Sequence, residues 1–289
     1  MNKPFFPLLI ILAAMILFAT TGSSAPVEIK PAWQSVNGFS GPESVVFDPI
    51  PRILLVSNGG SGDPLAKDGN GTIAKVALHG VMLDERWVTG LNGPKGMALI
   101  GDTLYVADID ELVIIDLRSG QKRHVAAPGA RSLNDIALDD QGRVYISDTL
   151  SNTIYRYAKG RLKSWLNSPK LAGPNGLLVQ GSNLYVASWG EISSSTPGQL
   201  LRVSLADKKI TPLAGLRGHL DGLAPDHQGG FWVTDFRAGL LLRTDKEGRV
   251  RQRLKLGAGC ADLAMLPVDW QLLIVPMMND NRVDGFSVK

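Results

Sequence analysis

The chain has 289 residues, among them 32 glycines and 17 prolines, so turns are dense and a coiled coil or helical bundle is excluded. Its 30 lysines and arginines nearly balance 27 aspartates and glutamates, which excludes an electrostatic nucleic-acid binder. A single cysteine, Cys260, excludes an intrachain disulfide scaffold and a cysteine-rich zinc module.

The first 25 residues have the pattern of an export signal. Lys3 precedes an apolar stretch from Phe5 to Phe18, and small residues follow up to Ala25. The stretch is shorter than the roughly 20 apolar residues that cross a bilayer, which favours a signal over a membrane anchor. Because a cut after Ala25 would leave Pro26 beside the cleaved bond, the cut can also fall a few residues earlier. We therefore expect an exported protein, periplasmic or extracellular, with no membrane contact after signal removal.

The remaining residues, 26–289, contain a sixfold repeat. Each segment has a turn, a strand, a second turn and a second strand, and the segments begin at Gly41, Gly93, Ser132, Gly173, His219 and Gly259. Their third residues are Glu43, Lys95, Asn134, Asn175, Asp221 and Ala261. This spacing matches the period of about 40 to 50 residues expected for propeller blades. A pair of β-sandwiches would also give short strands, but it does not explain the repeat.

The two ends of the chain predict how the ring closes. The last repeat stops after its third strand, at Phe286 to Val288, whereas Ala32 to Val36 with its Trp33 resembles an outer strand of the other repeats. We expect this N-terminal strand to complete the last blade, because closure removes an exposed sheet edge. The prediction is an all-β, six-bladed propeller with four strands per blade, forming one domain over residues 26–289.

The first strand of each blade lines the central channel, so equivalent residues at the strand starts meet near one end of the axis. Four of the six equivalent positions carry oxygen side chains: Glu43, Asn134, Asn175 and Asp221. Asp135 and Asp262 follow one residue later in two repeats. Such oxygens suit a hard cation, and calcium accepts an irregular set of them. The alternative is that each residue caps a turn, which is the role we expect for Asp108, Asp148 and Asp235 at the ends of second strands.

Four short motifs that open repeats carry a family resemblance: PES at Pro42, LND at Leu133, PNG at Pro174 and LDG at Leu220. They resemble the metal-site motifs of the senescence-marker/gluconolactonase (regucalcin-like) family over nearly all of residues 26–289. The resemblance implies a six-bladed propeller that binds a divalent cation, usually calcium, and hydrolyses lactone esters over it. It also implies that Glu43, Asn175 and Asp221 are metal ligands, that Asn134 contacts substrate or metal, and that Asp221 acts as the base.

Two positions depart from the family pattern. Sugar-lactone members have an arginine two residues before the LND-type asparagine, where this chain has Ser132, with Arg131 one residue further back. Because a one-residue offset turns a strand side chain to the other face, a sugar-acid substrate is in doubt. Lys95 places a cation in the inner ring, where it either pairs with Glu43 or anchors a substrate anion as a further catalytic-site residue.

Side chains beside the expected site predict its rim. Trp189, Phe236, Met277 and Met278 follow second strands and are expected to form an apolar substrate wall. His219 lies two residues before Asp221, where a turn role is favoured over a catalytic one, and the four histidines have no zinc-ligand spacing.

Two functions remain open from the sequence. The first is an exported, calcium-dependent hydrolase of lactones or related esters, acting as a monomer on a small-molecule substrate without nucleic acid. The alternative is a non-catalytic, NHL-like binding propeller with a structural ion in its channel. Oxygens that converge on an open metal position favour the hydrolase.

Overall fold

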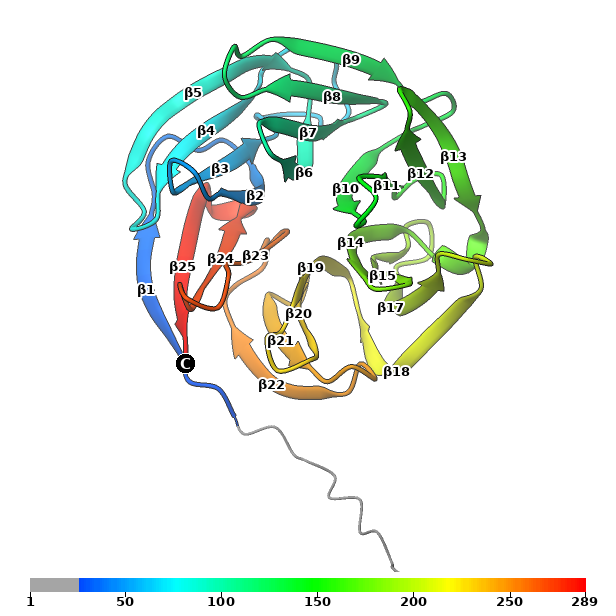
Figure 1. Ribbon diagram of the computed structural model, residues 1–289. Helices are drawn as coiled ribbons and strands as arrows, with labels where there is room; N and C mark the ends of the chain where they lie inside the picture. The colour runs from blue at the N-terminus through cyan, green and yellow to red at the C-terminus, as the bar shows by residue number, and fades with distance from the viewer. Residues whose placement is uncertain (1–25) are drawn as a thin grey trace, which may run out of the picture.

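The computed structural model describes residues 26–289, and within them six small antiparallel sheets surround a central axis (Figure 1). This confirms the six-bladed β-propeller. The predicted export signal, residues 1–25, lies outside the described residues. Within residues 26–289, no helix is long and apolar enough to cross a membrane.

The blades follow one another along the chain, and each runs from an inner strand at the axis to an outer strand at the rim (Figure 1). Blade 1 contains β2 (Pro42–Asp48), β3 (Ile53–Asn58), β4 (Gly71–Ala77) and β5 (Met82–Leu91). Blade 2 contains β6 (Pro94–Ile100), β7 (Thr103–Asp108), β8 (Glu111–Asp116) and β9 (Lys122–Ala126). Blade 3 contains β10 (Leu133–Leu138), β11 (Val144–Asp148), β12 (Thr153–Ala158) and β13 (Arg161–Asn167).

Blade 4 differs from the others by a short additional hairpin. It contains β14 (Pro174–Gln180), β15 (Asn183–Ser188), β16 (Gly190–Glu191), β17 (Thr196–Ser204) and β18 (Ile210–Gly218). Blade 5 contains β19 (Leu220–Pro225), β20 (Phe231–Asp235), β21 (Leu240–Thr244) and β22 (Val250–Lys255). Blade 6 contains β23 (Ala264–Met265), β24 (Leu272–Met277), β25 (Arg282–Val288) and β1 (Ile29–Ser35). Two short 3₁₀ helices, Pro169–Leu171 and Met278–Asp280, lie in loops.

The ring closes through the N-terminal strand, as predicted. β1 pairs antiparallel with β25, with Ile29 opposite Val288 and Ser35 opposite Val283. Trp33 packs against Gly285 so closely that a Cβ on this glycine would lie 2.3 Å from the indole ring. The first and last strands of the described chain therefore share one blade, and no other chain is needed to cover the outer edge of β25.

The apolar core lies mainly between neighbouring blades. Between blades 3 and 4, for example, Tyr145 and Trp165 pack with Leu184 and Leu201, and all four are buried. The tyrosine and tryptophan rings meet edge to face, with 5.1 Å between centroids. Outer strands instead have many exposed side chains, and β22 alternates between half-buried and exposed residues throughout its length. Each blade thus depends on its neighbours for burial, which makes closure of the ring important for stability.

Removal of β1 tests the importance of closure. Deleting residues 26–37 uncovers the edge of β25 and the packing surface of Gly285, so we expect a markedly lower melting temperature and aggregation through the open edge. Differential scanning calorimetry and size-exclusion chromatography measure both effects. An unchanged melting curve with a monomeric elution profile would show that closure contributes little.

Candidate metal centre

The strand register brings five of the six predicted inner positions to one end of the channel, whereas the sixth, Ala261, lies three residues before β23. Pro94 lies opposite Asp108, Leu133 opposite Asp148 and Leu220 opposite Asp235, so inner strands begin where second strands end. In blades 1 to 5, the residue after the inner-strand start is the predicted site residue. The register therefore confirms that these positions are equivalent in the blades.

A β-bulge follows the start of the inner strand in each of blades 1 to 5. In blade 1 the register shifts between Pro42 and Ser44, which leaves Glu43 as the additional residue. The corresponding shifts in the other four blades span Lys95, Asn134, Asn175 and Asp221. A bulge turns side chains out of the regular alternation and is frequent beside functional sites. The sequence repeat located these residues but gave no sign of the bulge.

Glycines after three of the site residues allow neighbouring inner strands to approach closely. A Cβ on Gly176 would lie 2.1 Å from the Asp221 carbonyl oxygen, and one on Gly222 would lie 2.7 Å from the Asp262 Cα. The glycine of the PNG motif therefore brings Asn175 beside Asp221 of the next blade. Their side chains meet, because Asn175 Nδ2 donates to Asp221 Oδ2 over 3.4 Å.

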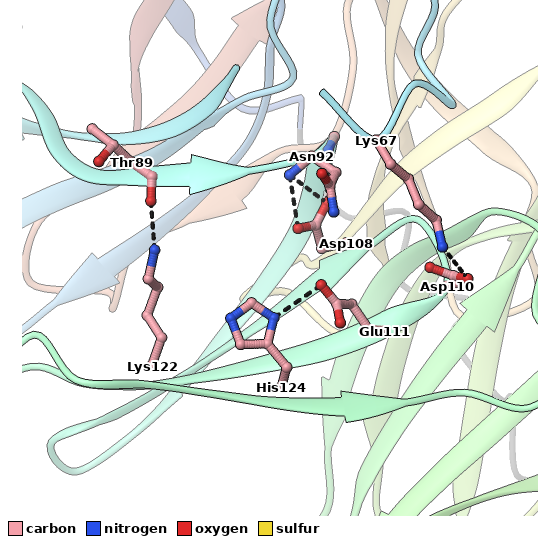
Figure 2. A network of polar contacts seen from close by, with 9 residues as sticks. Lys67, Thr89, Asn92, Asp108, Asp110, Glu111, Lys122 and His124 are labelled. Carbon is pink, nitrogen blue, oxygen red and sulfur yellow. Dashed lines mark hydrogen bonds and ion pairs between the residues drawn. The ribbon is translucent and has the colours of Figure 1, made fainter. Parts of the chain in front are cut away.

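Aspartates at the ends of second strands hold the loops that lead into the inner strands. Asp108 accepts hydrogen bonds from the backbone N–H of Asn92 (Figure 2). It also accepts one from the backbone N–H of Gly93. Asp148 accepts in the same way from Arg131 and Ser132, at 2.7 and 3.1 Å. Asp148 and Asp235 also cap turns as predicted, because each accepts from the backbone N–H three residues further on, of Ser151 and Ala238. The hydrogen bonds of Asp108 and Asp148 to the preceding loops were not predicted. They fix the starts of β6 and β10, which carry Lys95 and Asn134.

Glu43 and Asp221 are almost fully buried, with 5% and 4% of their surfaces exposed. Within residues 26–289, Glu43 Oε2 and Asp221 Oδ1 are buried without any hydrogen-bond partner. Such carboxylate oxygens are costly unless a cation or proton meets them. Asn175, 3% exposed, adds an amide group beside Asp221.

The electrostatics of these acids reflect burial among like charges. Burial raises the pKa of Glu43 from 4.5 to about 8, with a smaller rise from the Asp262 charge and an opposing effect of Lys95. Burial also raises the pKa of Asp221 well above its ordinary value, and Glu43 and Asp262 raise it further. The two side chains therefore interact across the channel, although they come from different blades.

Two more acids, at the position after the site residue, link inner strands. Asp135 accepts a 2.6 Å hydrogen bond from the backbone N–H of Leu177 in the next blade. Asp262 accepts one of 2.6 Å from the Ser44 hydroxyl, again in the next blade. Burial raises the pKa of Asp262 to about 6, and burial followed by the Asp262 charge raises the pKa of Asp135. Both acids increase the excess of negative charge in the channel.

Lys95 is the cation of this end of the channel and is only 8% exposed. Its charge lowers the pKa of both Glu43 and Asp221. Within residues 26–289, however, no carboxylate oxygen lies within ion-pair distance of its ammonium group, which donates no side-chain hydrogen bond either. The structure therefore does not join Lys95 to Glu43 in a direct pair, and its donors can meet a ligand. The half-buried Asn134 side chain likewise has no hydrogen-bond partner among the described residues.

The predicted ligand set contains two carboxylates and two amides. Accordingly, no group of three or more histidine, cysteine, aspartate or glutamate side chains in residues 26–289 is arranged to hold a metal ion. The donors are all oxygen groups of the kind that calcium takes, and two of them are unpaired carboxylate oxygens. In charge and donor type, the residues fit a hard divalent cation.

The rim carries part of the expected apolar wall. Trp189 and Phe236 lie together, with 5.4 Å between ring centroids, and both are half-buried. Met277 is fully buried in the core between blades 5 and 6, so its expected place in the wall is wrong. His219 Nδ1 lies 3.0 Å from the Trp189 carbonyl oxygen and therefore carries the proton, which gives the histidine a role in holding this loop.

Arg131 lies outside the channel. Its guanidinium contacts the Leu150 carbonyl oxygen over 3.4 Å, and the residue lines a rim hollow of about 670 Å³ that also includes Arg217. Ser132 is buried at the position where sugar-lactone members have arginine. The one-residue offset noted in the sequence thus corresponds to a different location of this side chain.

The fold and the channel define a class: six-bladed propellers with an oxygen-rich site where the inner strands begin. Within that class, the family model described as SMP-30/Gluconolactonase/LRE-like region matches residues 73–266, more than half of the chain. The chain belongs to this family. No curated protein sequence gives a significant match.

Solved structures share the fold at low sequence identity. A gluconolactonase from Xanthomonas campestris has a TM-score of 0.67 at 15% identity, covering 91% of this chain and 90% of that one. A calcium-binding protein, regucalcin, from Agrobacterium tumefaciens has a TM-score of 0.66 at 17% identity, covering 89% and 94%. A virginiamycin B lyase from Staphylococcus aureus has a TM-score of 0.62 at 11% identity, covering 91% and 99%. At these identities the likeness concerns the fold alone.

The raised pKa of Glu43 predicts a pH dependence of stability without metal. Between about pH 5 and pH 8 the unfolded chain loses a proton that the folded state retains, so the free energy of unfolding falls as pH rises. In chelator, the melting temperature should decrease over this window, and Glu43→Gln should flatten the decrease. The half-exposed Glu247→Gln serves as control and should leave the slope unchanged. Equal slopes in wild type and Glu43→Gln would contradict the burial of an ionisable Glu43.

Proposed function

We propose that this chain is a divalent-cation-dependent hydrolase of lactones or related esters, with calcium as the cation. The observation that carries the proposal is the pair of buried, unpartnered carboxylate oxygens, Glu43 Oε2 and Asp221 Oδ1, at the same end of the channel. Family membership supports it, since the matching model is described by gluconolactonase. The regucalcin that shares the fold is described as calcium-binding.

Glu43, Asn175 and Asp221 would hold the cation, and Asn134 would complete the set or contact the substrate. Calcium bound there would act as a Lewis acid that polarises the ester carbonyl. A cation also lowers the cost of burying Glu43 and Asp221 in their charged forms, because it supplies the opposite charge that both lack.

The side chains of the channel and its rim would accept the proton and position the substrate. Asp221 in its charged form can accept a proton from the water that attacks the ester, which makes it the candidate general base. Asn134, whose amide has no partner among the described residues, can donate a hydrogen bond to the substrate. The half-buried Trp189 and Phe236 on the rim provide an apolar surface for the remainder of the molecule.

Export of the mature protein and action as a monomer are parts of the same proposal. Lys3 and the apolar stretch from Phe5 to Phe18 support export. N-terminal sequencing of protein recovered from the cell exterior or periplasm tests this part, and an intact Met1 in that fraction would contradict it.

Calcium binding and hydrolysis can be tested on the same preparations. Calcium should raise the melting temperature of the wild type, because binding to the folded state alone stabilises it by about 2.7 kcal/mol at about a hundredfold excess over Kd. Asp221→Asn should lose this rise and the hydrolysis of a lactone panel, while the exposed Asp140→Asn should retain both. Calcium binding without hydrolysis in the wild type would favour the non-catalytic propeller. A wild-type melting temperature that calcium does not change would contradict the proposal.

Lys95 determines the expected charge preference for substrate. Because its ammonium group has no ion-pair partner among the described residues, it can anchor an anionic substituent, and Lys95→Met should weaken binding of carboxylate-bearing esters while sparing neutral lactones. Steady-state KM values for one ester of each kind measure this. An equal loss on both, together with altered calcium affinity, would show that Lys95 serves only to balance Glu43.

A further inference from the structure

A second polar hollow lies between blades 3 and 4, with a volume of about 820 Å³. Its lining includes six cationic side chains and no carboxylate: Arg143, Arg156, Lys159, Arg161, Lys163 and Lys208. The first five come from blade 3, and Lys208 comes from the turn between β17 and β18 of blade 4. For a chain of nearly balanced charge, this is a pronounced local excess of one sign.

The hollow lies toward the end of the propeller opposite the candidate metal centre. Thr153 at the start of β12 is opposite Asp148, at the end where the inner strands begin. The strand then runs to Ala158 at the other end, and Lys159 lies in the turn that follows. Lys208 occupies the corresponding turn of blade 4. This cluster is therefore separate from Glu43 and Asp221.

The charges in the hollow are largely unbalanced. Arg143 forms an ion pair with Asp139, with 2.5 Å between Nε and Oδ2. Among residues 26–289, the other five cations have no carboxylate within ion-pair distance. Arg156 also lies directly opposite Lys163 in the register of β12 and β13. Like charges at directly opposed positions destabilise a sheet, so the folded chain retains a local cost here.

In blade 5 an acid balances the cation at this position. Arg243 in β21 is the blade 5 equivalent of Arg156. In blade 3, Arg156 lies two residues after Ile154, which pairs with the buried Ser147. In blade 5, Arg243 lies two residues after Leu241, which pairs with the buried Thr234. Arg243 pairs with Asp226 at 2.8 Å and is fully buried.

In blade 3 the acid equivalent to Asp226 is Asp139, since each begins the turn between the first and second strands of its blade. The Asp139 carboxylate accepts hydrogen bonds from Arg143 Nε and from the Tyr145 hydroxyl. In blade 1 the equivalent Lys75 lies 4.1 Å above the Trp87 ring, in a hollow of about 210 Å³ that also includes Asp102. Blade 3 is thus the one of these three in which the hollow around this cation contains no acid.

We propose that the hollow between blades 3 and 4 binds a polyanion that carries phosphate groups. Several cations from two strands and a neighbouring blade surround one volume, which suits a compact, multiply charged anion rather than a single carboxylate. Arginine presents paired donors that match phosphate oxygens, and lysine adds point charges. Lys208, 5.6 Å from the centroid of the Trp165 ring, closes the side toward blade 4. A soluble phosphate oligomer and the headgroups of an anionic lipid share this chemistry.

Calorimetric titration with tripolyphosphate tests the site directly. The full mature chain should bind it with an affinity that falls as salt rises. The double variant Arg161→Glu, Lys163→Glu should bind about tenfold or more weakly, because it removes two charge-assisted contacts. A double variant with the same charge change elsewhere, Lys30→Glu, Lys246→Glu, serves as control and should retain the wild-type affinity. Equal affinity in both double variants would overturn the proposal.

Two further measurements keep the result interpretable. Without ligand, Lys163→Glu should keep or raise the melting temperature, since it replaces a like-charge pair with Arg156 by an opposite one. A loss of binding in this variant therefore cannot be attributed to unfolding.

Sedimentation with vesicles containing phosphatidylglycerol distinguishes the lipid source from the soluble one. Binding in either arm that depends on Arg161 and Lys163 supports the proposal. Absence of this dependence in both arms refutes it.

Discussion

The constraint on which this molecule depends is the enclosure of four carboxyl groups, Glu43, Asp135, Asp221 and Asp262, in a channel with one ammonium group, Lys95. Burial and mutual repulsion disfavour their charged forms, which is why the pKa of Glu43 rises to about 8 and that of Asp262 to about 6. Asp135 and Asp262 are stabilised by hydrogen bonds to neighbouring blades. Glu43 and Asp221 each keep one oxygen without a partner, and these two oxygens distinguish a binding site from a purely structural network.

The propeller provides the rigidity that such a site requires. Each site residue belongs to a bulge at the start of an inner strand, and a glycine after Lys95, Asn175 and Asp221 allows the neighbouring strand to approach. Aspartates at the ends of second strands accept hydrogen bonds from the backbone of the loops before the inner strands, and these bonds fix where the inner strands start. Closure of the ring by β1 then prevents the blades from separating. The geometry of the site is therefore a property of the whole ring rather than of any one blade.

The sequence predicted most of the fold because the repeat places equivalent residues at equal strand positions, and because the incomplete last repeat leaves room for the strand of Trp33. It also identified the four oxygen side chains of the inner ring. It could not show the bulges, because a bulge is defined by pairing with the partner strand, and one additional residue does not visibly change a short apolar pattern. Met277 was expected on the rim and lies in the core, where it pairs with Cys260 in an isolated bridge that the sequence does not reveal. The excess of positive charge in the hollow between blades 3 and 4 arises because Asp139 pairs with Arg143 and not with Arg156. Only the structure shows this choice of partner.

The most direct test of the central claim is isothermal titration of calcium into the wild type and into a Glu43→Gln, Asp221→Asn variant, in two buffers of different ionisation enthalpy near neutral pH. Because burial raises the pKa of both carboxyl groups, we predict that calcium binds the wild type with release of protons, seen as a heat that depends on the buffer. The variant should show no binding. Calcium binding of equal affinity in the variant, or the absence of binding in the wild type, would contradict the account.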